Sequence, residues 1–132
     1  MGGREREIVE DVFAMNWIAP VGPHIAQFEK KLSSLSSNFN IAALNSGTSA
    51  IHLALILSGV AKGDNVICSS FTFSASANPI EYIGANPIFI DADDYYNIDS
   101  EKVIEFIKSE TVFKNGFTYN KKAPANARAI IS

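Results

Sequence analysis

From residue 41 onward the sequence alternates short apolar runs with longer helical patterns, and this alternation narrows the choice of fold more than any other feature. Four runs have the length and composition of strands: 41–44, 65–68, 87–90 and 127–132. Between them lie three predicted helices: 48–58, 74–83 and 99–108. Strands that alternate with helices pair in parallel beneath a helical cover. We therefore predict an α/β domain with a mainly parallel sheet flanked by helices, which binds ligands at the carboxyl ends of its strands.

Two amphipathic helices precede this alternation. Apolar side chains recur at helical spacing over residues 5–16 and again over residues 25–35. Two prolines between them break the helical pattern, because proline lacks an N–H donor and fixes φ. We predict an N-terminal helical segment over residues 1–40 and a sheet domain over residues 41–132.

Three segments of the sheet domain carry further predictions. The helix over 48–58 is apolar on nearly every side, which is typical of a buried helix. Pro79 lies inside the helix predicted over 74–83, where a proline costs about 3 kcal/mol unless the helix bends or begins there. Residues 111–126 are polar and contain a glycine and a proline, so we predict a loop.

The composition argues against several functional classes. The net charge is -3, whereas binding to nucleic acid or to a membrane surface usually requires a basic face. The only cysteine, Cys68, lies in an apolar run and is expected to be a buried thiol. Two separated histidines and one cysteine give no metal-ligand spacing. With no signal-peptide pattern and no apolar run of the ~20 residues that span a bilayer, we expect a cytoplasmic protein with a small-molecule or protein partner.

The segment Asn-Ser-Gly-Thr-Ser, which follows the first predicted strand, is a candidate anion site. The first turn of a helix presents unpaired N–H groups and a partial positive charge, which suit a phosphate. Gly47 allows a close approach, and the hydroxyls of Thr48 and Ser49 supply further donors. The alternative is that Asn45 or Ser46 simply caps a core helix. The segment lacks the glycine pattern of a P-loop and that of a dinucleotide fingerprint.

Two aromatic residues with hydroxyl neighbours follow the second predicted strand. Phe71 and Phe73 alternate with Ser70 and Thr72 at a carboxyl end of the sheet. A ring at this position can lie flat on a heteroaromatic ligand. The alternative is that both rings belong to the core, where phenylalanine usually lies.

Five motifs occur in order and at consistent spacing. They are Asn-Ser-Gly-Thr-Ser-Ala-Ile-His-Leu-Ala-Leu from Asn45, Gly-Asp-Asn-Val-Ile from Gly63, Ser-Phe-Thr-Phe from Ser70, Gly-Ala-Asn-Pro-Ile-Phe-Ile-Asp from Gly84, and Tyr-Asn-Ile-Asp from Tyr96. Together they resemble the DegT/DnrJ/EryC1/StrS family of sugar aminotransferases, which depend on pyridoxal phosphate (PLP). The stretches 1–5 and 16–22 also look like that family, so the resemblance covers residues 1 to about 108.

The resemblance implies part of the large domain of a fold-type-I PLP-transferase, behind two leading helices. It implies a homodimeric enzyme that transfers an amino group from glutamate to a keto group on a nucleotide-linked sugar, for polysaccharide or glycoconjugate biosynthesis. In this family the Gly-Thr-Ser segment binds the PLP phosphate, so Gly47, Thr48 and Ser49 inherit that role. An aromatic residue of the Thr-Phe motif stacks on the PLP ring, and Phe73 inherits that role.

The resemblance also implies a substrate region in the N-terminal segment. The stretch 16–22 corresponds to residues near the sugar-nucleotide pocket. The expected substrate-binding residues are Asn16, Trp17, Pro20 and Gly22.

Two catalytic residues of the family have no counterpart here. The lysine that holds PLP as a Schiff base and the aspartate that pairs with its pyridine nitrogen both follow the strand at 127–132. The lysines of this chain do not match that position and are expected to be solvated, and Asp91 is expected to cap a turn. We therefore expect a chain truncated at its C-terminal end, and inactive alone. Two interpretations stay open: part of an aminotransferase, or a non-catalytic remnant that dimerises or binds the cofactor weakly.

Overall fold

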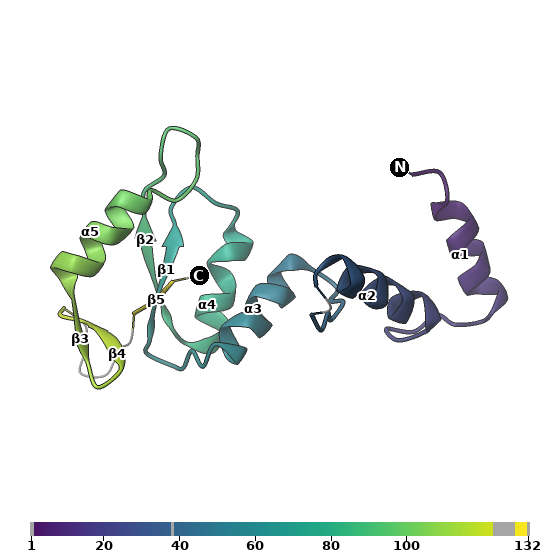
Figure 1. The fold of residues 1–132 in the computed structure, drawn as a ribbon, viewed down its shortest axis with the longest axis horizontal. Coiled ribbons are helices and arrows are strands. Elements are labelled where there is room, and N and C mark those ends of the chain that lie inside the picture. Colours follow the sequence, from purple (N-terminus) through teal and green to yellow (C-terminus); the bar gives the residue numbers. More distant parts are fainter. Residues whose placement is uncertain (1, 38, 123–128, 132) are drawn as a thin grey trace. The chain divides into compact units, whose positions relative to one another are not determined.

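The computed structural model describes residues 2–37, 39–122 and 129–131. The chain separates into two compact units, residues 1–43 and residues 44–132. The first unit contains helices, and the second contains a parallel sheet with helices around it (Figure 1). The mixed architecture predicted from the alternation of strands and helices is thereby confirmed.

The first unit is built from α1 (Glu5–Ala14) and α2 (Pro23–Leu35). α2 begins at a proline, which suits the first helical position because the N–H there has no intrahelical partner. The Nε2 atom of His24 lies 2.9 Å from the Oδ2 atom of Asp11, so a hydrogen-bond contact joins the two helices. Neither helix has a fully buried residue within the described part of the chain. This unit therefore has little core of its own.

The second unit is organised around a sheet of three parallel strands in the order β2-β1-β5. These strands are β1 (Asn65–Ser69), β2 (Asn86–Ile90) and β5 (Ala129–Ile131). Three α-helices accompany them: α3 (Gly47–Leu57), α4 (Asn78–Ile83) and α5 (Ser100–Glu110). Ile67 of the central strand is paired with Ile88 on one side and with Ile131 on the other. Residues 65–68 are all buried because β1 has a strand on each side and helices pack on both faces of the sheet.

The two faces of the sheet carry separate cores. On one face, Leu55 of α3 and Ile80 of α4 pack with Val66 of β1. On the other face, Val103 of α5 packs with Ile67 of β1. Successive residues of a strand point to opposite faces, so neighbours in the sequence enter different cores. Figure 1 shows α5 on one side of the strands and α4 on the other.

The strand predicted over residues 41–44 does not form. This apolar run has no regular secondary structure. A strand exists through ladder bonds to a neighbour, and no described strand pairs with this segment. The prediction was wrong because it used only the apolar composition of the segment. Composition does not show whether a neighbouring strand is available for pairing.

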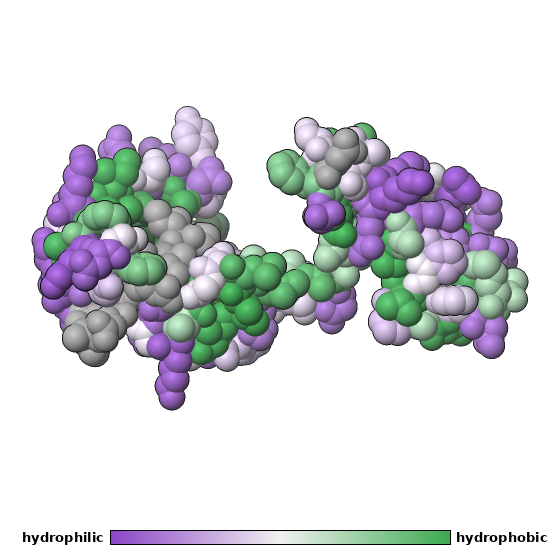
Figure 2. All heavy atoms as spheres, turned by 60° about the horizontal axis from the view of Figure 1, so that its bottom comes forward, coloured by the Kyte–Doolittle hydropathy of each residue, from purple (hydrophilic) through white to green (hydrophobic). Residues whose placement is uncertain are grey.

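The expectation that α3 is a buried helix was also wrong. Of its residues only Leu55 is fully buried, whereas the side chains of Leu53 and Ile56 are exposed and Leu57 is 78% exposed. Figure 2 shows hydrophobic atoms gathered along α3. Leu55 packs into the core with α4 and β1. Within the second unit, the apolar side that carries Leu53, Ile56 and Leu57 is exposed.

The segment predicted as a loop over 111–126 begins with a β-hairpin. β3 (Thr111–Lys114) pairs antiparallel with β4 (Phe117–Asn120). Asn115 and Gly116 join them with φ values of 53° and 81°, which is the backbone of a type I′ turn. The Asn-Gly pair was the sequence signal for this hairpin. Residues 123–126 of the predicted loop lie outside the described residues.

Pro79 marks the start of a helix. A short 3₁₀ turn, η1 (Ser74–Ser76), comes first, and α4 then begins at Asn78 with Pro79 in its first turn. The proline therefore removes no helical hydrogen bond, and the predicted helix over 74–83 is divided at the position where a proline is tolerated.

Within the described residues, no helix is long and apolar enough to span a bilayer. The same residues contain no group of three or more His, Cys, Asp or Glu side chains that could hold a metal ion. Cys68 lies in the core, where burial raises the pKa of its thiol.

Candidate functional site: a helix N-terminus and an aromatic loop

The first turn of α3 is capped by one serine. Ser46 has extended backbone geometry, and its Oγ accepts a hydrogen bond from the N–H of Ser49 at 3.2 Å. The same Oγ donates to the hydroxyl of Ser49 at 3.1 Å. The capping interaction considered as an alternative thus exists, with Ser46 and not Asn45 in the role.

Capping uses only part of the donor capacity of this turn. Within the described residues, the N–H groups of Gly47 and Thr48 have no hydrogen-bond partner. A Cβ atom placed on Gly47 would meet no described atom within 4 Å. The α3 N-terminus therefore offers two free N–H donors, a partial positive charge and open space, and this combination suits an anion.

The aromatic loop, defined as residues 70–73, follows the carboxyl end of β1. Its side chains are not core residues: Phe71 is 61% exposed and Phe73 is 80% exposed. The hydroxyl of Thr72 lies 2.8 Å from that of Ser76, which fixes the loop to η1. η1 in turn packs against α3. The structure thus places the loop beside the helix that carries the free donors, and rejects the alternative that both rings lie in the core.

The four predicted substrate residues lie in the first unit, and two of them line a small hollow. Trp17 and Gly22 line a cavity of about 200 Å³ together with apolar neighbours. The indole N–H of Trp17 donates to the carbonyl of Val21. Asn16 ends α1 in a left-handed conformation with φ 52°, and Pro20 is exposed. Asn16 and Pro20 do not line the hollow.

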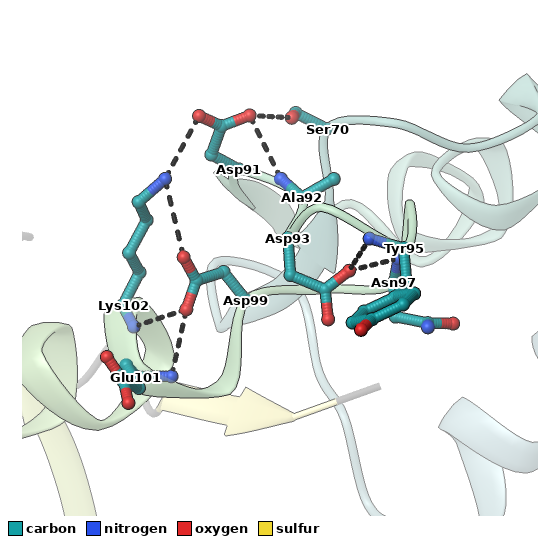
Figure 3. A network of polar contacts seen from close by, with 9 residues as sticks. All are labelled: Ser70, Asp91, Ala92, Asp93, Tyr95, Asn97, Asp99, Glu101 and Lys102. Atoms are coloured by element: carbon teal, nitrogen blue, oxygen red, sulfur yellow. Dashed lines mark hydrogen bonds and ion pairs between the residues drawn. The ribbon is translucent and has the colours of Figure 1, made fainter.

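A charged network at the carboxyl end of β2 was not predicted (Figure 3). The Nζ atom of Lys102 lies 3.1 Å from a carboxylate oxygen of Asp91 and 3.4 Å from one of Asp99. Asp91 also accepts a hydrogen bond from the N–H of Ala92 at 2.9 Å, as expected for a turn cap. Lys102 is exposed, as expected for a solvated lysine, and it also forms two ion pairs that the sequence did not predict. The signal in the sequence was its position three residues after Asp99, on the first turn of α5.

The network shifts the pKa values of its members. The hydrogen bond from Lys102 holds the pKa of Asp91 below its ordinary value. Asp99 caps α5 by accepting from the N–H groups of Lys102 and Glu101, and these bonds lower its pKa. The pKa of Lys102 is raised, mainly by its hydrogen bond to Asp91. All three side chains keep their charges at neutral pH.

Comparison with known proteins identifies the family of this chain. A model of the DegT/DnrJ/EryC1/StrS aminotransferase family matches residues 1–123. The chain belongs to this family. The family predicted from the five motifs is therefore confirmed.

Two curated members of the family match well. EpsN of Bacillus subtilis, whose name places it among pyridoxal phosphate-dependent aminotransferases, is 50% identical over 93 residues, covering 70% of this chain and 24% of EpsN. The GDP-perosamine synthase of Caulobacter vibrioides is 38% identical over 112 residues, covering 84% of this chain and 30% of the synthase. The chain thus spans between about a quarter and a third of the length of these relatives.

Solved structures of the family share the fold. An aminotransferase of this family from Brucella abortus aligns with a TM-score of 0.73 and 34% identity, over 80% of this chain and 28% of that one. The sugar aminotransferase Spr1654 of Streptococcus pneumoniae, in its PLP form, aligns with a TM-score of 0.71 and 30% identity, over 80% of this chain and 27% of Spr1654. The α/β fold implied by the resemblance is thereby confirmed.

Proposed function

We propose that this chain is the part of a PLP-dependent sugar aminotransferase that holds the phosphate and one face of the cofactor. The reaction is the transfer of an amino group from glutamate to a keto group on a nucleotide-linked sugar. Relatives named GDP-perosamine synthase and spore coat polysaccharide biosynthesis protein SpsC support this substrate class and a role in polysaccharide or glycoconjugate biosynthesis. The observation that supports the proposal is the pair of free N–H donors at the start of α3, a helix that packs against η1, to which the exposed aromatic loop is hydrogen-bonded.

The phosphate residues in this proposal are Gly47, Thr48 and Ser49. The N–H groups of the first two are free within the described residues, and the third adds a hydroxyl. A phosphate gains from these donors and from the positive end of the helix dipole. Because a side chain at residue 47 would fold without a clash, the glycine is better explained by a ligand that approaches the backbone closely.

Phe73 is the proposed stacking residue for the pyridine ring. Its side chain is 80% exposed, so the face of its ring is available for contact with a ligand. When bound, PLP supplies the electron sink for amino transfer. The contribution of Phe73 is to fix the plane of the ring by contact with its face.

The residues proposed for the sugar nucleotide are Asn16, Trp17, Pro20 and Gly22. The exposed indole face of Trp17 and the apolar hollow beside it can receive a base or a sugar ring. We further propose that the parent enzyme is a cytoplasmic homodimer. The exposed apolar side of α3 supports burial against further protein.

The 132 residues by themselves are expected to show no transaminase turnover. Amino transfer needs a lysine at the Schiff-base position, and the lysines of this chain lie elsewhere. A single-turnover assay with glutamate and PLP that yields an amine product would contradict this expectation.

The phosphate site can be tested with 4′-deoxypyridoxine 5′-phosphate, which lacks the aldehyde and therefore cannot form adducts with surface lysines. The variant Gly47→Asp is expected to weaken binding by about tenfold or more, because a carboxylate repels the phosphate. The fold should persist, since an acidic residue is favourable in the first turn of a helix. Isothermal titration calorimetry measures the affinity, and circular dichroism monitors the helix content.

The matched control is Ser100→Asp, which adds the same charge at the first position of α5. It should bind the ligand as tightly as the unmodified chain. Equal affinity of the Gly47→Asp variant and the unmodified chain would show that α3 does not hold the phosphate.

A further inference from the structure

The loop that follows β2 is closed at its base by one lysine. Asp91 precedes the loop, Asp99 follows it, and the Nζ atom of Lys102 contacts both carboxylates at 3.1 and 3.4 Å. The N–H of Asp99 also donates to the carbonyl of Asp91 at 2.9 Å. We call these three residues the lysine clamp (Figure 3). The clamp brings two like charges together and neutralises them through Lys102.

The loop inside the clamp has a defined conformation. The carboxylate of Asp93 accepts hydrogen bonds from the N–H groups of Tyr95 and Asn97, each at 2.9 Å (Figure 3). Tyr96 lies between them with φ 64°, in the left-handed region that a bulky residue rarely adopts. Such a conformation persists only where the surrounding contacts fix it, so the closed base and the Asp93 turn hold Tyr96 in place.

Tyr96 connects this loop to the aromatic loop. Its ring centroid lies 5.0 Å from that of Phe71, with a tilt of 33° between the planes. Phe71 is two residues before Phe73. A second connection starts at Ser70, whose N–H donates to the carbonyl of Ile90 at 2.8 Å and whose hydroxyl lies 3.5 Å from Asp91.

We propose that Lys102 is a positioning residue: it closes the β2 loop, Tyr96 then holds Phe71, and the aromatic loop is thereby kept in the conformation that presents Phe73 to the cofactor ring. This inference rests on the proposed function, and it assigns to the network a role in holding the ring and none in holding the phosphate.

The exposure of the network distinguishes positioning from global stabilisation. The Lys102 side chain is 48% exposed, and exposed ion pairs contribute little to the free energy of unfolding. Removing the charge should therefore leave the two cores intact and change only the population of the ordered loop. The affinity of a ring ligand falls in proportion to that population.

The test compares Lys102→Met with two further variants of the same helix. Lys102→Arg keeps the positive charge and can still reach both carboxylates. Lys108→Met removes a lysine of α5 that lies outside the clamp. Nuclear Overhauser effects between the rings of Phe71 and Tyr96 report the loop directly. Calorimetric titrations with 4′-deoxypyridoxine 5′-phosphate and with inorganic phosphate report ring and phosphate binding separately.

Lys102→Met is expected to lose the inter-ring effect and to bind the ring ligand about fivefold more weakly, with unchanged phosphate affinity. Lys102→Arg and Lys108→Met should match the unmodified chain. A Lys102→Met variant that keeps both the inter-ring effect and the affinity for the ring ligand would overturn the inference. If the unmodified chain binds neither ligand, the proposed function is wrong, and the inter-ring effect alone still decides whether Lys102 positions the aromatic loop.

Discussion

Gly22 and Gly47 both lie at the start of a helix, but the chain requires a glycine only at the first. Gly22 has φ 152°, and a Cβ atom there would lie 2.3 Å from the Nε1 atom of Trp17. Gly47 has no such neighbour within 4 Å among the described residues. The local structure therefore explains Gly22 by the indole packed against it. Packing within the described residues does not explain a glycine at residue 47. A phosphate that approaches the backbone closely would explain it.

These two glycines predict opposite results for the same substitution. Gly22→Ala should displace the indole of Trp17 and destabilise the chain by about 1–3 kcal/mol, because the added Cβ clashes with the ring and the φ of 152° is one that side chains rarely adopt. Gly47→Ala should be neutral or stabilise by up to about 1 kcal/mol, since alanine is the better helix former. Trp17 is the only tryptophan, so the emission of the indole reports its environment directly. Unchanged emission in Gly22→Ala would contradict the packing of the indole against residue 22.

At the scale of elements, the first turns of α3 and α5 contain the polar groups of the candidate site and of the lysine clamp. α3 begins with a serine cap and leaves donors free, whereas α5 begins with Asp99, whose carboxylate accepts from two N–H groups of its own first turn. The two helix starts therefore differ in charge: the first can accept an anion, and the second already contains one. This difference explains why α3 and not α5 is the candidate phosphate site.

The lysine clamp predicts a dependence of stability on pH. The pKa values of Asp91 and Asp99 are lowered from an ordinary value of 3.8, so their contribution is complete above that value and is lost as pH falls through the lower folded pKa. The pKa of Lys102 is raised, so its contribution is lost only as pH rises through a folded pKa above 10.5. The stability difference between the unmodified chain and Lys102→Met is expected to be small because the ion pairs are exposed, to be constant near neutral pH and to shrink in acid. Urea unfolding followed by circular dichroism at several pH values measures it. A difference that grows as the carboxylates are protonated would contradict the assignment.

At the scale of the whole chain, α3 presents an exposed apolar surface. Leu57 is 78% exposed at the end of a helix whose other exposed residues are also apolar. Exposed apolar patches of this kind mark surfaces that associate. The relatives that match are three to four times longer than the residues they share with this chain.

Self-association through α3 can be tested with one charged substitution. Leu57→Lys should weaken association of the chain, and the free energy of unfolding should change by less than about 0.5 kcal/mol because the side chain packs against little. The control is Leu35→Lys, which places the same charge at a leucine of similar exposure, 80%, in the first unit. Sedimentation velocity over a range of concentrations measures the association. Equal effects of the two substitutions would argue against α3 as the associating surface.

The sequence by itself determined the order of most of the main elements and the parallel sheet, and it singled out the residues that we propose for the phosphate site. These features follow from local signals: apolar periodicity, prolines, glycines and an ordered set of motifs. The Asn-Gly turn of the hairpin was present in the same way and was overlooked. Only the tertiary structure decided that residues 41–44 form no strand, that α3 exposes an apolar side, and that Lys102 joins Asp91 to Asp99. Each of these features depends on which distant segments of the chain become neighbours. A local sequence pattern does not specify which segment will pair with a strand, cover a helix face or neutralise a charge.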